Sequence, residues 1–260
     1  MARSEESRTV KTAETVFGIV ETLQERRGAR ISELATELGM ANSTVYDHLT
    51  TLERSEYVVK DADGVYRLSL KYLDHGMHAL SFYDAVASDV KPTLRRLAEE
   101  AGTTVWFVVE EHGKLVYLLT ATGENPSTTP SRIGSRRPLH ATACGKAILA
   151  HMTDERVTEI LDRHGMESRT ERTITDRDQL ADELETVRED GYAVNDEELI
   201  PGLIAFGVPI VVDDEILGAV GVSGPSHQLG SPRARERVPE LALGAVNEIA
   251  LKRKYSNRSG

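Results

Sequence analysis

The 260-residue sequence is poor in cysteine and lysine and contains no long apolar run. Its single cysteine, Cys144, excludes an internal disulfide and a Cys-rich zinc site. No segment approaches the roughly 20 apolar residues of a membrane helix, and the first residues, MARSEESRTVK, lack the apolar core of a signal peptide. We therefore expect a soluble, cytoplasmic protein with no membrane partner, long enough for two modest domains.

Acidic residues outnumber basic ones, and lysine is scarcer than arginine. The chain carries 42 acidic and 31 basic residues, an excess of 42 − 31 = 11, and only 8 of the 31 basic residues are lysines. An acidic, lysine-poor surface keeps a protein hydrated at very high salt. The composition therefore favours a halophilic source over an ordinary acidic mesophilic protein. Taken alone, the negative charge argues against a nucleic-acid partner.

The N-terminal quarter nevertheless has the pattern of a DNA-binding module. Residues 12–23, 31–38 and 42–53 carry apolar side chains at helical spacing, and Asn42 suits the N-cap of the third helix. Two strand-like runs within residues 57–68 flank Asp63-Gly64, which is a strong hairpin signal. Three helices with a tight turn before the third, then a hairpin, predict a winged helix-turn-helix over residues 1–76. The recognition helix is about 42–53 and the wing about 57–68.

The recognition helix is expected to face DNA with small or hydrogen-bonding side chains. Its apolar stripe faces the core, which leaves outward Asn42, Ser43, Thr44, Tyr46, Asp47 and His48. Residues 1–76 hold 10 basic and 13 acidic side chains, a net charge of 10 − 13 = −3. At molar salt counterion release contributes little to affinity, so we expect binding through shape, hydrogen bonds and dimerisation. Local cations are expected at Arg30, Arg54, Lys60 and Arg67. A winged helix that contacts only protein is the alternative.

The rest of the chain, residues 77–260, predicts an α/β domain with an antiparallel sheet, so the whole fold is of the α+β class. Helical spacing continues from Leu70 as a linker helix that can pair with its partner in a dimer, and Pro92 is expected to restart a helix. Thr142 is expected to cap a helix running to about His151. No G-x-G-x-x-G segment and no phosphate loop is present.

The only cysteine lies four residues after His140, at this same helix start. A Cys/His hydrolase needs a base within hydrogen-bond reach of the nucleophile, and here the distance is not fixed by helical geometry. The small residues of ATACGKA instead favour close approach of a ligand to free helix amides, as in an anion site. Four basic residues just upstream would strengthen binding of an anion there, unless they lie in a solvated loop or a dimer contact. They are Arg132, Arg136, Arg137 and His140.

Metal binding and cofactors are not expected. Only His75 and His78 have a ligand-like spacing, and the available histidines are otherwise scattered along the chain: His75, His78, His140, His151 and His164. We therefore predict that the C-terminal domain recognises a small molecule and is not an enzyme. A Cys/His-dependent hydrolase and a protein-interaction module are the competing interpretations.

Two long segments, RRPLHATACGKAILA and DGYAVNDEELIPGLIAFGVPI followed by GAVGVSGP, resemble the effector-domain motifs of the IclR family of transcriptional regulators. The resemblance covers nearly the whole chain. It implies an N-terminal winged helix-turn-helix, a linker helix and a C-terminal GAF-like effector-binding domain. It also implies a homodimer or dimer of dimers on a palindromic operator in double-stranded DNA. The effector would be a small organic acid, and the target a metabolic, catabolic gene or operon under repression or activation.

By motif position the family's effector pocket maps to seven residues, Ala143, Cys144, Asn195, Leu203, Ala205, Gly221 and Ser223. Relatives carry an acid and a cysteine where this chain has Asn195 and Ala205, so this side of the pocket is less polar. The identity of the effector therefore cannot be transferred. The family commonly has a basic residue at the position of Asp47. This carboxylate can accept from cytosine N4, or it points toward Arg54 or solvent.

Overall fold

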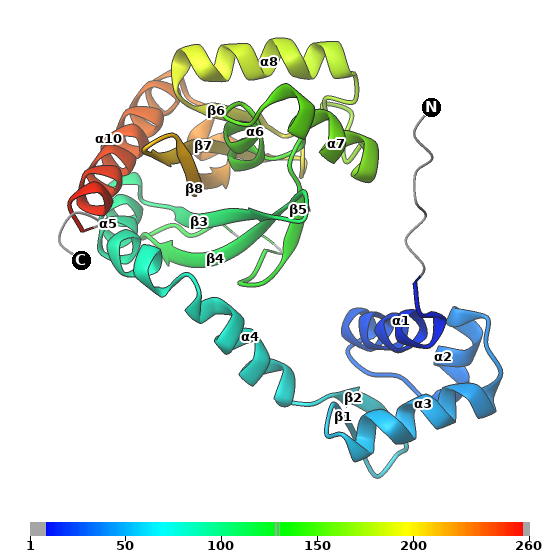
Figure 1. Cartoon of the computed structure of the whole chain (residues 1–260). Helices are drawn as coiled ribbons and strands as arrows, with labels where there is room; N and C mark the ends of the chain where they lie inside the picture. The colour runs from blue at the N-terminus through cyan, green and yellow to red at the C-terminus, as the bar shows by residue number, and fades with distance from the viewer. Residues whose placement is uncertain (1–8, 128, 130, 257–260) are drawn as a thin grey trace. The chain divides into compact units, whose positions relative to one another are not determined.

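The computed structural model describes residues 9–127, 129 and 131–256 (Figure 1). The chain divides into two compact units, Met1–Ser81 and Phe82–Gly260. The division falls five residues after the boundary expected from the sequence, because the helix over the junction continues to Ser81.

The first unit is a winged helix-turn-helix, as predicted. It consists of α1 (Lys11–Arg26), α2 (Ile31–Leu38), α3 (Asn42–Arg54), β1 (Val58–Lys60), β2 (Tyr66–Leu68) and α4 (Lys71–Ser81). Apolar side chains from one stripe of each of the first three helices form a core with the wing strands, including Ile19, Leu34, Val45, Leu49 and Tyr66. Gly39 ends α2 with φ 63°, a left-handed conformation that glycine adopts without strain.

The predicted cap of α3 is wrong by one residue. Ala41 is the N-cap, with extended φ and ψ, and its carbonyl accepts the first helical bond from the amide of Val45 at 3.1 Å. Asn42 is therefore the first residue inside the helix. The cap has no side-chain hydrogen bond, and the buried stripe of Val45, Leu49 and Leu52 holds the helix in place.

The second unit is built on a six-stranded antiparallel sheet with the order β5-β4-β3-β8-β7-β6. The strands are β3 (Thr104–Glu111), β4 (Lys114–Thr122), β5 (Arg136–Pro138), β6 (Ala193–Asp196), β7 (Leu203–Val212) and β8 (Glu215–Pro225). The helices are α5 (Asp84–Ala101), α6 (Ala143–Leu149), α7 (Asp154–His164), α8 (Arg177–Asp190), α9 (Ser226–Leu229) and α10 (Pro232–Ser256). This arrangement confirms the predicted α+β class.

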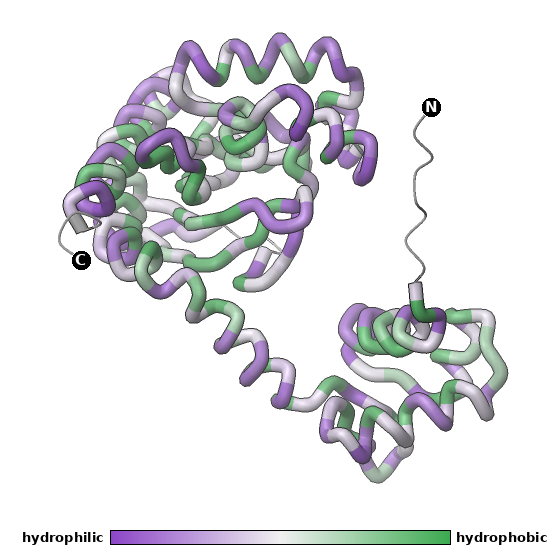
Figure 2. Tube along the Cα trace, viewed as in Figure 1, coloured by the Kyte–Doolittle hydropathy of each residue, from purple (hydrophilic) through white to green (hydrophobic). Residues whose placement is uncertain are grey.

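Helices cover the sheet on both faces (Figure 1). α6 packs with Trp106 and Val108 of β3, α8 packs against α6, and Ile160 and Leu161 of α7 belong to the same apolar core. Val105 and Phe107 alternate with those residues along β3 and are fully buried on the opposite face, which α5 and α10 cover. Figure 2 shows hydrophobic residues along the central strands and hydrophilic residues along the outer helix α8.

Pro92 lies inside α5 and does not start it, contrary to the prediction. The helix begins at Asp84, and Pro92 removes one backbone donor from its interior. Burial of Val90, Thr93 and Leu94 next to the proline holds the helix together. Tertiary packing thus outweighs the local helix-breaking preference.

Candidate functional site

A cavity lies between the start of α6 and the sheet in the second unit. Its volume is about 40 Å³, which exceeds the roughly 10–15 Å³ that one water molecule needs. The lining residues come from several elements of the unit: Trp106, Val108, Leu115, Tyr117, Thr129, Ser131, Thr142, Ala143, Cys144, Asn195, Leu199, Ile200, Leu203, Ala205, Gly221 and Ser223. The cavity therefore has room for more than one water-sized group.

The start of α6 is held directly against the strands. Thr142 caps the helix as predicted, because its hydroxyl accepts from the amide of Gly145 at 3.1 Å. A Cβ at Gly207 on β7 would lie 2.4 Å from the amide nitrogen of Cys144. A Cβ at Gly221 on β8 would lie 2.5 Å from its sulfur. The small residues of this region therefore bring the helix backbone onto the sheet.

Cys144 is not an activated nucleophile. Burial raises the pKa of its thiol to about 12, so the group is protonated at neutral pH. His140 faces elsewhere: its Nε2–H donates to the carbonyl of Glu167 at 3.2 Å, and burial lowers the pKa of the ring. Within the described residues no hydrogen bond joins Cys144 to His140. The pair required for a Cys/His hydrolase does not form.

Seven of the nine residues predicted to bind effector line the cavity, Ala143, Cys144, Asn195, Leu203, Ala205, Gly221 and Ser223. Arg132 and His140 do not. Arg132 is exposed on a turn closed by Ser135, and Arg136 forms an ion pair with Glu111. Among the described residues, the cavity wall contains no charged side chain, so hydroxyls, an amide and backbone groups supply its polarity.

Sequence reasoning missed one aromatic wall of the cavity. Trp106 and Tyr117 meet edge to face with ring centroids 4.8 Å apart. Burial raises the pKa of the Tyr117 phenol, against the effect of its hydrogen bond with Ser131. Trp106 pairs in register with Gly221 across β3 and β8. The sequence would therefore have placed Trp106 beside a predicted pocket residue if the pairing of these two strands had been known.

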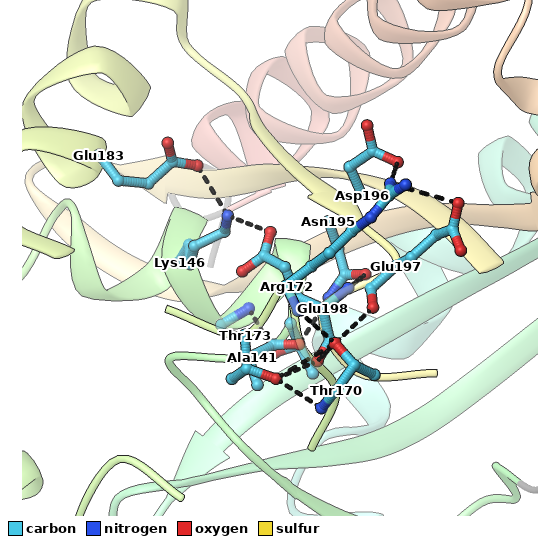
Figure 3. A network of polar contacts seen from close by, with 12 residues as sticks. Ala141, Lys146, Thr170, Arg172, Thr173, Glu183, Asn195, Asp196, Glu197 and Glu198 are labelled. Carbon is cyan, nitrogen blue, oxygen red and sulfur yellow. Dashed lines mark hydrogen bonds and ion pairs between the residues drawn. The ribbon is translucent and has the colours of Figure 1, made fainter. Parts of the chain in front are cut away.

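A cluster of charged side chains joins Lys146 of α6 to Glu183 of α8 and to Glu198 (Figure 3). Lys146 is 1% exposed, and its Nζ donates to Glu183 Oε1 and Glu198 Oε1, both at 2.7 Å. Burial raises the pKa of Glu198, although the Lys146 ammonium opposes the shift. Asn195 connects the cluster to the cavity, since its amide donates to the Ala141 carbonyl at 2.5 Å and accepts from the Glu198 amide at 3.2 Å.

The recognition helix presents the predicted side chains outward. Asn42, Ser43, Thr44, Tyr46 and Asp47 are exposed, and His48 is half-buried. In the described part of the first unit no ion pair joins Asp47 to Arg54.

The four predicted cations lie on the surface of the first unit, where Arg30 reaches the wing and Lys60 and Arg67 lie on the wing strands. Arg30 donates to the Asp63 carbonyl at 2.5 Å, and Arg67 pairs with Asp61 at 3.6 Å. Lys60 lies over the Tyr66 ring, 5.3 Å from its centroid. Arg54 is exposed at the end of α3.

Over residues 9–127, 129 and 131–256, no group of three or more His, Cys, Asp or Glu side chains has a metal-binding arrangement. Two of the scattered histidines contact backbone carbonyls, His151 that of Ala147 and His164 that of His112. None of the described helices has both the length and the apolar character to cross a membrane.

The fold and the cavity define a class of protein, a winged-helix DNA-binding regulator with a small-molecule domain. The first unit matches the IclR helix-turn-helix domain over residues 12–62. Residues 77–251 match the C-terminal domain described as bacterial transcriptional regulator IclR C-terminal. The chain belongs to the IclR family of transcriptional regulators, which is a family of DNA-binding proteins and not of enzymes.

Relatives match nearly the full length of the chain. The "Probable HTH-type transcriptional regulator ArcR" of Halobacterium salinarum is 30% identical over 96% of this chain and 97% of its own. The crystal structure of the Thermotoga maritima IclR is 27% identical, with a TM-score of 0.74 over 94% of this chain and 99% of that one. An IclR homolog complexed with 4-hydroxybenzoate, from Microbacterium hydrocarbonoxydans, has the same fold at 19% identity, with a TM-score of 0.79 over 95% and 100% of the two chains.

Proposed function

We propose that this IclR-family regulator controls a metabolic, catabolic gene or operon, and that a small organic acid in the cavity changes its affinity for a palindromic operator. The cavity at the start of α6 is the observation that carries the proposal. It is small, lined mostly by buried residues, and includes the seven residues that the family resemblance assigns to the effector. Mostly apolar pockets with a few convergent polar groups are typical small-molecule sites.

The chemistry of the wall supports a small acid with an apolar or aromatic body. Trp106, Val108 and Leu115 offer apolar surface, while Ser131 and Ser223 carry hydroxyls that can donate to a carboxylate. The complex of an IclR homolog with 4-hydroxybenzoate is an example of such a ligand in this fold. Because Arg132 and His140 do not line the cavity, neutral groups of the wall make the contacts with the proposed effector.

A homodimer, or a dimer of such dimers, would place two recognition helices on the two halves of a palindrome. The first unit exposes large apolar side chains on α1 and before and along α4: Phe17, Leu70, Leu73 and Met77. α4 buries no residue within the chain. These apolar surfaces support pairing between two copies. The lysine-poor, acidic composition supports a halophilic, cytoplasmic setting.

Footprinting of the full chain on DNA upstream of its own gene, at high KCl, tests the proposed operator binding. We expect a protected palindrome, and we expect Tyr46→Ala to lose protection because this side chain is exposed on α3. Tyr255→Ala removes an exposed tyrosine from α10 and serves as the matched control, with protection retained. Absence of protection anywhere in that region would instead favour a protein-interaction module.

A further inference from the structure

The loop between β6 and β7 closes one side of the cavity. Leu199 and Ile200 line the cavity, while Pro201 and Gly202 are exposed to solvent. The loop therefore has an apolar inner side over the site and an outer side in water. Any opening of this loop would expose Cys144, whose side chain lines the same cavity.

Left-handed residues lie at both ends of this loop. Glu197 has φ 63° and Gly202 has φ 76°. This conformation is strained for a glutamate, and residues held in it commonly mark sites of conformational change. The loop is also closed on itself, since the Glu197 amide donates to the Leu203 carbonyl at 3.0 Å and the Gly202 amide donates to Glu197 Oε2 at 2.8 Å. It can therefore move as one piece about its two ends.

A turn at residues 170–173 holds the loop from the outside (Figure 3). Thr170 Oγ1 donates to the Glu197 carbonyl at 2.8 Å, and Thr173 Oγ1 donates to the Glu198 carbonyl at 2.6 Å. Arg172 pairs with Glu197 Oε1 at 3.3 Å and with Asp196 Oδ1 at 3.2 Å. All these contacts come from one short turn and end on the first two residues of the loop or on Asp196, the last residue of β6.

The closed position leaves one buried polar atom unsatisfied. Glu198 Oε1 accepts from Lys146, but Glu198 Oε2 is buried without a hydrogen-bond partner in the part of the chain that the structure describes. A buried carboxylate oxygen without a donor disfavours the closed state, because the oxygen would gain water if the loop opened. The contacts from the turn and the ion pair between Lys146 and Glu198 favour the closed loop, and this penalty opposes them, so loss of one contact should shift the balance measurably.

We propose that residues 197–202 form a hinged lid over the cavity, that the turn at residues 170–173 holds it shut, and that ligand reaches the cavity when the lid opens. The proposal rests on the proposed function in that it takes the cavity as the ligand site. Thr170, Arg172 and Thr173 are positioning residues, which set the closed position of the lid without lining the cavity. Glu197 and Gly202 are its hinges.

The only cysteine provides a direct assay that needs neither the effector nor DNA. We would measure the rate at which N-ethylmaleimide labels Cys144 in the full chain, from zero to low urea. Thr170→Val removes the one hydroxyl group whose proton is shared between the lid carbonyls of Glu197 and Glu198, and a hydrogen bond of this kind corresponds to about a fivefold change in the opening equilibrium. We expect about fivefold faster labelling, nearly independent of urea, because a local opening exposes little surface.

Arg172→Gln is a second variant, since this side chain is more than half exposed and its loss leaves the core intact. It should also accelerate labelling. Thr186→Val is the matched control, because it removes a similar hydroxyl bond within α8, to the Asp182 carbonyl, away from the lid. Wild-type rates in both lid variants would overturn the proposal, as would acceleration with the steep urea dependence of global unfolding. A failure to find an operator would leave these rates unaffected.

Discussion

The contact between Gly221 and Cys144 gives a quantitative test of the cavity wall. A Cβ at position 221 would lie 2.5 Å from the sulfur of Cys144, against 3.4 Å or more for ordinary contact. Apart from its chain neighbours, its only other neighbour within 4 Å among the described residues is the Phe206 carbonyl oxygen, at 3.7 Å. The sulfur therefore accounts for all of the steric conflict that Gly221→Ala would create.

Overpacking of a well-packed core costs about 1–3 kcal/mol, and replacing glycine by alanine within a strand returns about 0.5–1 kcal/mol. In the wild-type background we expect Gly221→Ala to lower the free energy of unfolding by about 1 kcal/mol. In a Cys144→Ala background, where the sulfur is absent, the same change should raise it by about 0.5 kcal/mol. The coupling energy is thus about 1.5 kcal/mol, within the range for residues in contact.

Urea unfolding of the four proteins of this cycle measures the coupling directly. The variants Gly221→Ala, Cys144→Ala and the double variant are compared with wild type at equal protein concentration, because a dimer's stability depends on concentration. A Gly221→Ala effect that is the same in both backgrounds, within 0.3–0.5 kcal/mol, would refute the packing of α6 on β8 described above.

Three further predictions concern the effector, the salt dependence and the pH dependence. Cys144→Ser should leave DNA binding intact, whereas Ala143→Leu should fill the cavity and abolish the response to effector, and an unaltered response in gel shifts would place the pocket elsewhere. Arg30 and Arg67 are engaged by the wing, so a dimer with two remaining cations per subunit should show a log–log salt slope of about −4; a slope near −10 would contradict this. The hydrogen bonds from Arg96 and Lys252 lower the pKa of Glu248 from 4.5 to about 2, so its stabilisation is full above pH 4.5 and is lost as the pH falls toward about 2. Glu248→Gln should cost about 1 kcal/mol or less at neutral pH, and a wild-type-minus-variant difference that persists in thermal melts at pH 2 would be inconsistent with the ion pairs.

The fold of the first unit could be predicted from the sequence because each of its elements has a local signal. The apolar stripe of α3 and the Asp63-Gly64 turn each indicate a structure within a short window. The errors arose where a local preference competed with packing. Asn42 was a better cap by propensity than Ala41, and Pro92 a better helix start than Asp84, yet buried side chains determined both helices.

In the second unit, less of the site could be predicted from local sequence patterns. Seven cavity residues were placed by motif resemblance, but Trp106 and Tyr117 were not, because no local pattern tells which face of a strand lies under α6. The partners of Lys146 lie 37 and 52 residues further along the chain. His140 was expected near the ligand as a cation, and only the structure shows that its ring contacts the Glu167 carbonyl.

The central claim is that occupation of the cavity changes DNA affinity. A thermal-shift screen of small carboxylates would first identify a compound that stabilises wild type and fails to stabilise Ala143→Leu. Operator affinity of the full chain, measured by fluorescence anisotropy with and without this compound, is then the most direct test. The account predicts a change of at least about fivefold, absent in Ala143→Leu. A compound that binds the cavity and leaves operator affinity unchanged would contradict the account.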